Sequence, residues 1–184
     1  MSDLAGFSGL VSIRDVGAQG MLTLRGDLND PQFTEAVTQV CGLALPPLRG
    51  VVTSGDRSLL WMSPDELALL LPKAQAPDMV AKLADATAGL HAMVVDVSDA
   101  RAHFEIEGRV VRETIAKLAP VDMHADSFAT DTLRRTRFGQ VAAGFWMPDA
   151  RRARIFCFRS VRDYMANLLM AAADEHSEVS YFQK

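Results

Sequence analysis

The sequence predicts an α+β protein with a largely antiparallel sheet and helices packed on it. Short segments of alternating hydrophobicity, typical of half-buried strands, are interleaved with segments of helical periodicity. Glycine, proline, aspartate and serine separate these segments, and several strands follow one another without a helix between them. The order in the first half favours a ferredoxin-like split β-α-β unit. The length of 184 residues fits one domain, or two small lobes sharing a core.

The first elements are a strand and a helix. Residues 21–26 alternate in the manner of a half-buried strand. Asn29-Asp30-Pro31 then provides an Asx cap, with a proline in the first turn where its missing N–H costs nothing. Gly42 is predicted to end the helix. Four apolar residues of this helix share one face: Phe33, Val37, Val40 and Cys41.

A hairpin and a buried segment follow. Residues 51–53 and 58–62 flank the turn-forming run 54–57, which predicts two paired strands. Residues 66–71 form a continuous apolar run that stops at Pro72. Its length favours a buried strand, although the leucine-rich composition also allows a helix.

The middle of the chain predicts a helix at residues 77–88, with Gly89 as its C-cap, and a short buried strand at residues 93–97. Asp96 and Asp99 bracket Ser98 directly after that strand. We interpret them as a structural corner, in which the side chains bind nearby backbone N–H groups and Arg101 can pair with one of the carboxylates.

The second half repeats the alternation of strands and helices. Residues 103–107 predict a strand on which His103 faces the surface, and a helix with Val111, Ile115 and Leu118 on one side follows. Residues 125–131 are loop-like. Strands are expected at residues 135–138, 141–147 and 154–158, with a turn at 148–150. Ser160 is predicted to cap the last helix, and the tail at residues 177–184 has no periodicity.

Charge and cysteine usage exclude several classes of function. The formal net charge is −4 and no basic stripe dominates, so nucleic-acid binding is not expected. The basic clusters at residues 134–137 and 151–154 are interpreted as solvated faces or partner contacts. Cys41 and Cys157 belong to no metal-ligand pattern and are expected to be buried thiols. The sequence shows no secretory signal and no membrane-spanning run, which predicts a cytoplasmic protein.

The chain offers little evidence of catalysis. There is no G-x-S-x-G, no H-x-x-x-H, no C-x-x-C, and no glycine-rich nucleotide loop. His124 follows Asp122 and is expected to cap the loop after a helix. Trp61 and Trp146 could line a pocket, but structural tryptophans or partner contacts are favoured. We therefore name no catalytic, cofactor-binding or metal-binding residue. Tyr181 and Phe182, which are expected to be exposed on a polar tail with little else to pack against, are the predicted partner interface.

The chain carries six segments in a fixed order: Leu45-Pro46, Trp61–Glu66, Val95–Arg101, Pro120 with Asp122, His124 and Phe128, Arg135-Thr136-Arg137, and Arg159-Ser160 with Asp163 and Tyr164. Together, in this order, they resemble the gamma subunit of heterotetrameric sarcosine oxidase. The resemblance spans roughly residues 40–173, within a single predicted domain of residues 1–184 whose ends are expected to be partner-contacting or mobile. One departure is Ser63, where the family pattern has glycine, and another is Val161-Arg162 in place of Phe-Ala.

The resemblance implies a trimmed relative of the folate-binding domain of aminomethyltransferases. Domains of that kind have an acidic residue near the folate pterin, for which Asp96 is a weak candidate here. It implies assembly with a large alpha subunit, a flavin-carrying beta subunit and a small zinc-binding delta subunit. That complex oxidatively demethylates sarcosine to glycine and hydrogen peroxide and passes the one-carbon unit to tetrahydrofolate. FAD, FMN, NAD, tetrahydrofolate and zinc are expected in the other subunits, and this chain is expected to supply surface to the assembly.

Three hypotheses remain open from the sequence. The first is a non-catalytic gamma subunit of sarcosine oxidase, or the corresponding subunit of an N-methylglutamate dehydrogenase-type complex. The second is a stand-alone folate-binding module related to aminomethyltransferases, which predicts tetrahydrofolate affinity in the isolated chain. The third is an unrelated α+β ligand-binding or scaffold domain, which predicts no flavoprotein partner.

Overall fold

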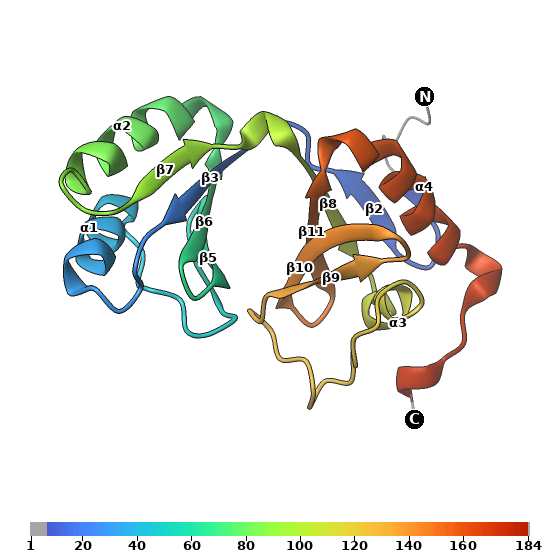
Figure 1. Ribbon diagram of the computed structural model, residues 1–184. Coiled ribbons are helices and arrows are strands. Elements are labelled where there is room, and N and C mark those ends of the chain that lie inside the picture. The colour runs from blue at the N-terminus through green and yellow to red at the C-terminus, as the bar shows by residue number, and fades with distance from the viewer. Residues whose placement is uncertain (1–6, 184) are drawn as a thin grey trace. The chain divides into compact units, whose positions relative to one another are not determined.

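The computed structural model describes residues 7–183, which belong to two compact units (Figure 1). One unit, here the five-stranded unit, is formed by Ala18–Asp99. The other, here the six-stranded unit, combines Met1–Gly17 with Ala100–Lys184. Every strand pair in both sheets is antiparallel. The predicted α+β class with antiparallel sheets is therefore confirmed. No helix within residues 7–183 is long and apolar enough to cross a membrane.

The five-stranded unit has the spatial strand order β4-β5-β6-β3-β7. Leaving out the edge strand β4, one helix follows β3 and the other follows β6. This is the ferredoxin-like split β-α-β arrangement that the sequence predicts. Its elements in chain order are β3 (Gln19–Arg25), α1 (Pro31–Cys41), β4 (Val51–Ser54), β5 (Arg57–Ser63), β6 (Glu66–Pro72), the 3-10 turn η1 (Lys73–Gln75), α2 (Ala76–Ala86) and β7 (Met93–Asp96).

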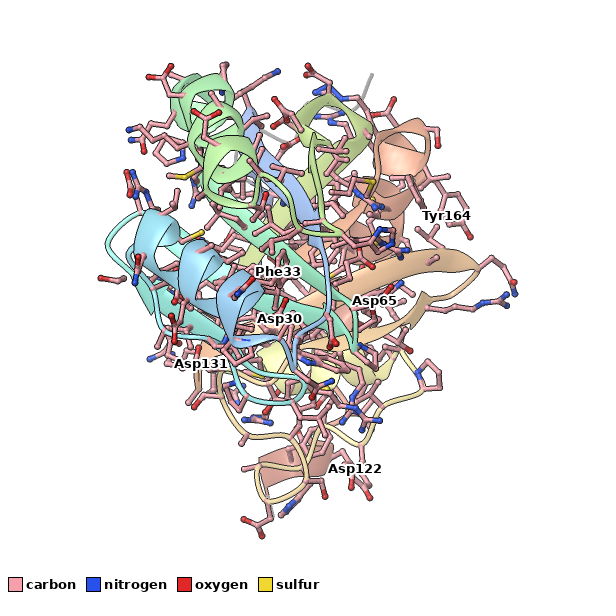
Figure 2. The ribbon with its side chains drawn as sticks, turned by 60° about the vertical axis from the view of Figure 1, so that its left-hand side comes forward. Asp30, Phe33, Asp65, Asp122, Asp131 and Tyr164 are labelled. Carbon is pink, nitrogen blue, oxygen red and sulfur yellow. The ribbon has the colours of Figure 1, made fainter. Side chains whose placement is uncertain are left out.

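Both helices of this unit pack on the same side of the sheet (Figure 1). Asp30 caps α1 by accepting a hydrogen bond from the Gln32 backbone N–H at 2.9 Å, and Gly42 ends it with a φ of 69°. Phe33 lies one turn after the cap and is buried against the sheet (Figure 2). The leucine-rich segment forms strand β6, and not the helix that its composition also allowed.

The six-stranded unit has the order β1-β2-β8-β11-β10-β9. Its core lies between this sheet and the helices α3 and α4. Its elements are β1 (Phe7–Ser8), β2 (Ser12–Asp15), β8 (Arg101–Glu107), α3 (Val111–Ala116), β9 (Arg134–Phe138), β10 (Val141–Asp149), β11 (Arg152–Phe158), the turn η3 (Arg159–Val161), α4 (Arg162–Ala172) and the turns η4 (Glu175–Ser177) and η5 (Tyr181–Gln183).

The two units share one topology, which no sequence repeat reveals. The order β9-β10-β11-β8-β2 corresponds to β4-β5-β6-β3-β7, strand for strand. The segment from β6 through η1 to α2 has the same element lengths as the segment from β11 through η3 to α4: 7, 3 and 11 residues. Strand β7 directly precedes β8 of the other unit, and its equivalent β2 directly precedes β3, so the chain passes between the units twice.

Two expectations about strands are wrong. Strand β7 is an edge strand, and Met93 and Val95 are 43% and 40% exposed, because β-branched composition does not distinguish an edge strand from a central one. His103 is 5% exposed, although it was expected at the surface. It lies on β8, between β2 and β11, directly opposite Phe156, with ring centroids 6.2 Å apart. A central strand has neighbours on both sides, which buries this position.

Three element ends also differ from expectation. Ser160 does not cap the last helix: it lies inside η3, and α4 begins after Val161 without a side-chain cap. Helix α2 ends at Ala86 and its C-cap is Thr87, whose hydroxyl donates to the Leu83 carbonyl at 2.8 Å, so Gly89 follows the cap instead of forming it. Strand β10 continues through Pro148 past an irregularity in its pairing, where a missing N–H is tolerated.

Candidate functional site

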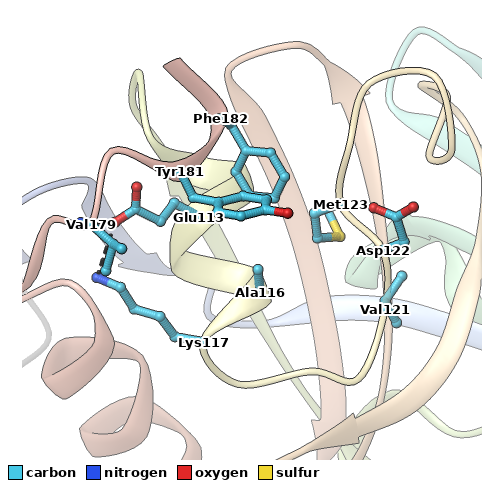
Figure 3. A pocket seen from close by; sticks show the side chains of 9 residues that line it. All are labelled: Glu113, Ala116, Lys117, Val121, Asp122, Met123, Val179, Tyr181 and Phe182. Atoms are coloured by element: carbon cyan, nitrogen blue, oxygen red, sulfur yellow. Dashed lines mark hydrogen bonds and ion pairs between the residues drawn. The ribbon is translucent and has the colours of Figure 1, made fainter. Parts of the chain in front are cut away.

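A pocket of about 350 Å³ opens in the six-stranded unit between α3, the loop that follows it and the C-terminal segment (Figure 3). Most of its wall is apolar, which suits an apolar side chain or ligand group. Both residues of the predicted partner interface belong to it. The residues that line the pocket are Glu113, Ala116, Lys117, Val121, Asp122, Met123, Val179, Tyr181 and Phe182.

Helix α3 fixes the C-terminal segment through two charged side chains. The buried carboxylate of Glu113 accepts a hydrogen bond from the Val179 backbone N–H at 2.6 Å and lies 3.6 Å from the Lys117 ammonium. Lys117 donates to the Ser177 carbonyl at 2.6 Å and to its hydroxyl at 3.0 Å. It also donates to the Ala172 carbonyl at the end of α4, at 3.2 Å. Charged groups make stronger hydrogen bonds than neutral ones, so this pair ties the segment to α3.

The two aromatic rings of the segment differ in burial. Tyr181 and Phe182 meet edge to face, with centroids 4.9 Å apart. Tyr181 is 70% exposed, as the sequence predicts, whereas Phe182 is partly buried and packs against the core of the unit. The expectation that both lack packing partners is therefore wrong for Phe182. Their role at an interface stays a prediction.

The opposite wall of the pocket is a loop held by local hydrogen bonds. Asp122 accepts a hydrogen bond from the His124 backbone N–H at 3.0 Å. The Ser127 hydroxyl and that N–H lower the pKa of Asp122. The His124 Nδ1 accepts a hydrogen bond from the Asp126 N–H at 3.4 Å, so this histidine caps the loop as predicted. From α3, Arg112 donates to the Met123 and Phe128 carbonyls at 2.9 and 3.0 Å, which anchors the loop.

Sequence reasoning missed Arg112, Glu113 and Lys117. The spacing of Glu113 and Lys117 is i to i+4 on a helix, a signal of an ion pair that was present in the sequence. Their contacts to the C-terminal segment join residues about 60 positions apart. Such contacts leave no local pattern.

The predicted corner at the end of β7 is present and belongs to the five-stranded unit. The Asp96 carboxylate accepts hydrogen bonds from the Ser98 N–H, at 2.9 Å, and from the Ser98 hydroxyl. The Ser98 hydroxyl oxygen in turn accepts the Met21 N–H at 3.0 Å, and Asp99 pairs with Lys73. Asp96 therefore has hydrogen-bond partners within the corner, as its interpretation as a structural corner predicts. The Arg101 guanidinium lies over the Phe158 ring at 4.1 Å.

The tryptophans belong to different units and neither lines the pocket. Trp61 packs on the core of the five-stranded unit, and Trp146, on β10, is 2% exposed. Cys41 and Cys157 are buried free thiols, as predicted, and burial raises the pKa of each to about 11. Within residues 7–183, no group of three or more histidine, cysteine or acidic side chains has an arrangement that could hold a metal ion.

The basic clusters make contacts within their own unit. Arg152 pairs with Asp149 at 2.8 Å, and Arg154 pairs with Glu105 at 3.2 Å. In the other cluster, the Arg134 guanidinium lies 5.8 Å from the Phe128 ring centroid.

A comparison with protein families shows that most of the chain matches one family. Residues 25–175 match the family model described as "Sarcosine oxidase, gamma subunit family". The chain belongs to the sarcosine oxidase gamma subunit family. The match confirms the resemblance and begins earlier than the residues 40–173 that carry it in the sequence.

Relatives within this family match most of the chain. The gamma subunit of sarcosine oxidase from Corynebacterium sp. (strain U-96) is 26% identical over 170 residues, covering 91% of this chain and 81% of the relative. The one from Corynebacterium sp. (strain P-1) is 23% identical over 170 residues, covering 91% and 82%.

Solved structures share the fold. A chain of the heterotetrameric sarcosine oxidase from Corynebacterium sp. U-96, solved with pyrrole 2-carboxylate, is 23% identical with a TM-score of 0.84, covering 95% of this gamma-family chain and 90% of that chain. Glycine cleavage system aminomethyltransferase T from Bartonella henselae is 12% identical with a TM-score of 0.65, covering 88% of this chain and 46% of the other. The predicted likeness to an aminomethyltransferase folate-binding domain is therefore confirmed as a likeness of fold.

Proposed function

We propose that this chain is the gamma subunit of a heterotetrameric sarcosine oxidase and that its role is assembly, with no catalytic residue of its own. The family match over residues 25–175 carries the proposal. The complex would convert sarcosine to glycine and hydrogen peroxide and pass the one-carbon unit to tetrahydrofolate. The alpha, beta and delta subunits would hold FAD, FMN, NAD, tetrahydrofolate and zinc.

The chemistry of the described side chains supports an assembly role. The groups that a catalytic hypothesis would recruit already have structural partners: Asp96 is bound within its corner, and His124 caps a loop. Burial raises the pKa of both thiols to about 11, which disfavours the nucleophilic thiolate at neutral pH.

The pocket at the C-terminal segment supports a docking role. Tyr181 presents an exposed ring beside apolar pocket walls, and its segment is held in place by Glu113 and Lys117. Tyrosine is enriched at interface hot spots because it buries a large area with little loss of side-chain freedom. We therefore place one contact with another subunit at Tyr181 and the adjoining pocket.

Co-expression with the other three subunits tests the proposal. The complex should contain this chain and oxidise sarcosine; a complex that assembles and turns over sarcosine fully without this chain would contradict it. Assays with sarcosine and N-methylglutamate separate the two substrate classes.

The likeness to aminomethyltransferase T favours a second candidate, a folate-binding module. It predicts that the isolated chain binds tetrahydrofolate, which calorimetry measures directly. Saturable binding that Asp96→Asn abolishes, without loss of fold, would favour this candidate over a purely assembling subunit.

A further inference from the structure

The pocket between α3 and the C-terminal segment contains one charge that is not balanced within the chain. Three of its nine lining residues are charged: Glu113, Lys117 and Asp122. Glu113 and Lys117 have opposite charges, and their side chains approach to 3.6 Å. Within residues 7–183, no lysine or arginine forms an ion pair with Asp122. The lining therefore has an excess negative charge, which is located at Asp122.

The lysine of the pocket has no donor left for a ligand. A lysine ammonium has three N–H donors. Those of Lys117 match three acceptors of the C-terminal region: the Ser177 carbonyl at 2.6 Å, the Ser177 hydroxyl at 3.0 Å and the Ala172 carbonyl at 3.2 Å. The buried Glu113 carboxylate is likewise engaged by the backbone of the C-terminal segment. This pair therefore holds the structure together, and Asp122 is the charge that a ligand can reach.

The Asp122 carboxylate is exposed and ionised at neutral pH. It accepts the His124 N–H at 3.0 Å and a hydrogen bond from the Ser127 hydroxyl, and both lower its pKa. An ionised carboxylate has about four positions at which it accepts hydrogen bonds. Two local bonds orient the Asp122 carboxylate and leave acceptor positions for a further donor.

Apolar and aromatic groups surround this carboxylate. The buried Met123 and the partly buried Val121 belong to the lining, as do the rings of Tyr181 and Phe182. In Figure 3 the Tyr181 hydroxyl and the Asp122 carboxylate are directed toward Met123 from opposite sides. The volume of about 350 Å³ suits a small ligand. An aromatic ring attracts a cation that lies within about 6 Å of its centre, so the rings and the carboxylate favour the same charge.

We propose that this pocket binds a small organic cation: a substituted ammonium ion with an apolar body. The ammonium donates to the Asp122 carboxylate beside the Tyr181 ring, and the apolar body lies against Val121 and Met123. An anion or a zwitterion has no partner for its negative charge, because the Lys117 donors are occupied. This inference goes beyond the proposed function and requires only the residues of this chain.

NMR titration of the isotope-labelled full-length chain tests the inference. The chain is used without its partners, because the proposed function places a subunit contact at the same pocket. The probes are benzylammonium, benzyl alcohol and benzoate, which share an apolar body and differ in charge. At constant ionic strength, benzylammonium should cause saturable shifts at Met123 and Ala116. Benzyl alcohol should bind about fivefold more weakly, and benzoate should cause no shift at the pocket.

Two variants and a control assign the binding to its residues. Asp122→Asn should weaken benzylammonium binding about fivefold or more, because it removes the charge but keeps an oxygen that accepts the His124 N–H. Tyr181→Leu should weaken it about threefold, because it keeps an apolar side chain but removes the ring. Asp126→Asn is the matched control: Asp126 is exposed in the same loop and does not line the pocket, so binding should be unchanged.

Three results would overturn the inference: no saturable shift at the pocket with benzylammonium, equal binding of the three probes, or equal weakening by Asp122→Asn and Asp126→Asn. The last result would mean that general attraction by the loop, and not the pocket, draws the cation. None of these results affects the proposed function, which association with the other subunits tests. A chain that binds benzylammonium as described and does not assemble with them would overturn the proposed function alone.

Discussion

Asp15 and Asp96 occupy equivalent corners of the two units. The Asp15 carboxylate accepts the Gly17 N–H at 2.7 Å, and the Asp96 carboxylate accepts the Ser98 N–H at 2.9 Å. Each is the last residue of its strand, β2 or β7, shortly before the chain passes to the other unit. The residue after each aspartate donates its N–H to a backbone carbonyl of the neighbouring strand. Val16 donates to the His103 carbonyl on β8 at 2.9 Å, and Val97 donates to the Met21 carbonyl on β3 at 2.8 Å.

These corners predict a stability difference between two substitutions. Asp96→Ala should lower the free energy of unfolding by about 1–2 kcal/mol, because the Ser98 N–H and hydroxyl lose their acceptor. Asp15→Ala should cost at least as much, because Asp15 also pairs with Arg162 on α4 at 2.5 Å. Urea unfolding measures both, with Asp56→Ala in an exposed turn as the control. Equal stability of all chains would contradict the corner as a structural device.

The buried thiols predict a loss of stability in alkali. Burial raises the pKa of Cys41 and Cys157 from 9.0 to about 11 in the folded chain. The unfolded chain therefore releases these protons first, and stability falls as pH rises from about 9 to 11. The double variant Cys41→Ala/Cys157→Ala should show a shallower decline over this range in urea unfolding. An unchanged slope would mean that the thiols are not buried as described.

His103 predicts the opposite dependence in acid. Burial, with Arg101 nearby, lowers the pKa of its imidazole from 6.5 to about 4. The unfolded chain takes up the proton below about pH 6.5 while the folded chain stays neutral, so stability falls as pH drops from 6.5 to 4, by roughly 2–3 kcal/mol. NMR titration of the His103 ring checks the pKa directly. A midpoint near 6.5 would refute this burial effect, and His103→Gln should flatten the dependence.

Lys117 should control the mobility of the C-terminal segment. Lys117→Met removes donors to the Ser177 and Ala172 carbonyls, so amide exchange at residues 177–182 should accelerate about tenfold or more. Arg109→Gln is the control: its exposed pair with Glu178 should contribute little. Hydrogen exchange followed by mass spectrometry separates the two. Equal exchange in both variants would mean that the ammonium does not hold the segment.

Tyr181 and Phe182 should differ in what their removal affects. Tyr181→Ala should weaken association with the other subunits while leaving the unfolding midpoint unchanged, because the ring is exposed. Phe182→Ala should lower stability by about 1 kcal/mol, because that ring packs against the core. Thermal unfolding and binding assays on the same preparations test this. A Tyr181→Ala chain that associates normally would remove this residue from the interface.

Much of the fold follows from local sequence signals. Asp30-Pro31 and Gly42 define both ends of α1, and the turn residues 54–57 identify the β4–β5 hairpin, because caps and turns depend on residues a few positions apart. The burial of His103 and the exposure of β7 depend on which strands are neighbours. That information is set by pairing across the sheet, which a single strand's composition does not contain.

The site was less predictable than the fold. Tyr181 stands out in a polar tail, and its exposure is confirmed. The pocket beside it requires α3, the loop at residues 121–123 and the tail to meet, and these are joined by contacts such as Glu113 to Val179 across 66 positions. The sequence also does not reveal the shared topology of the two units, because equivalent strands resemble one another in burial and hydrogen bonding more than in residue identity.

The most direct test of the central claim is affinity purification of the tagged full-length chain from its native host, followed by mass spectrometry and visible absorption of the eluate. Assembly as a gamma subunit predicts a yellow complex that contains a large flavoprotein set and oxidises sarcosine. A colourless, solitary chain recovered from a lysate that oxidises sarcosine would contradict it.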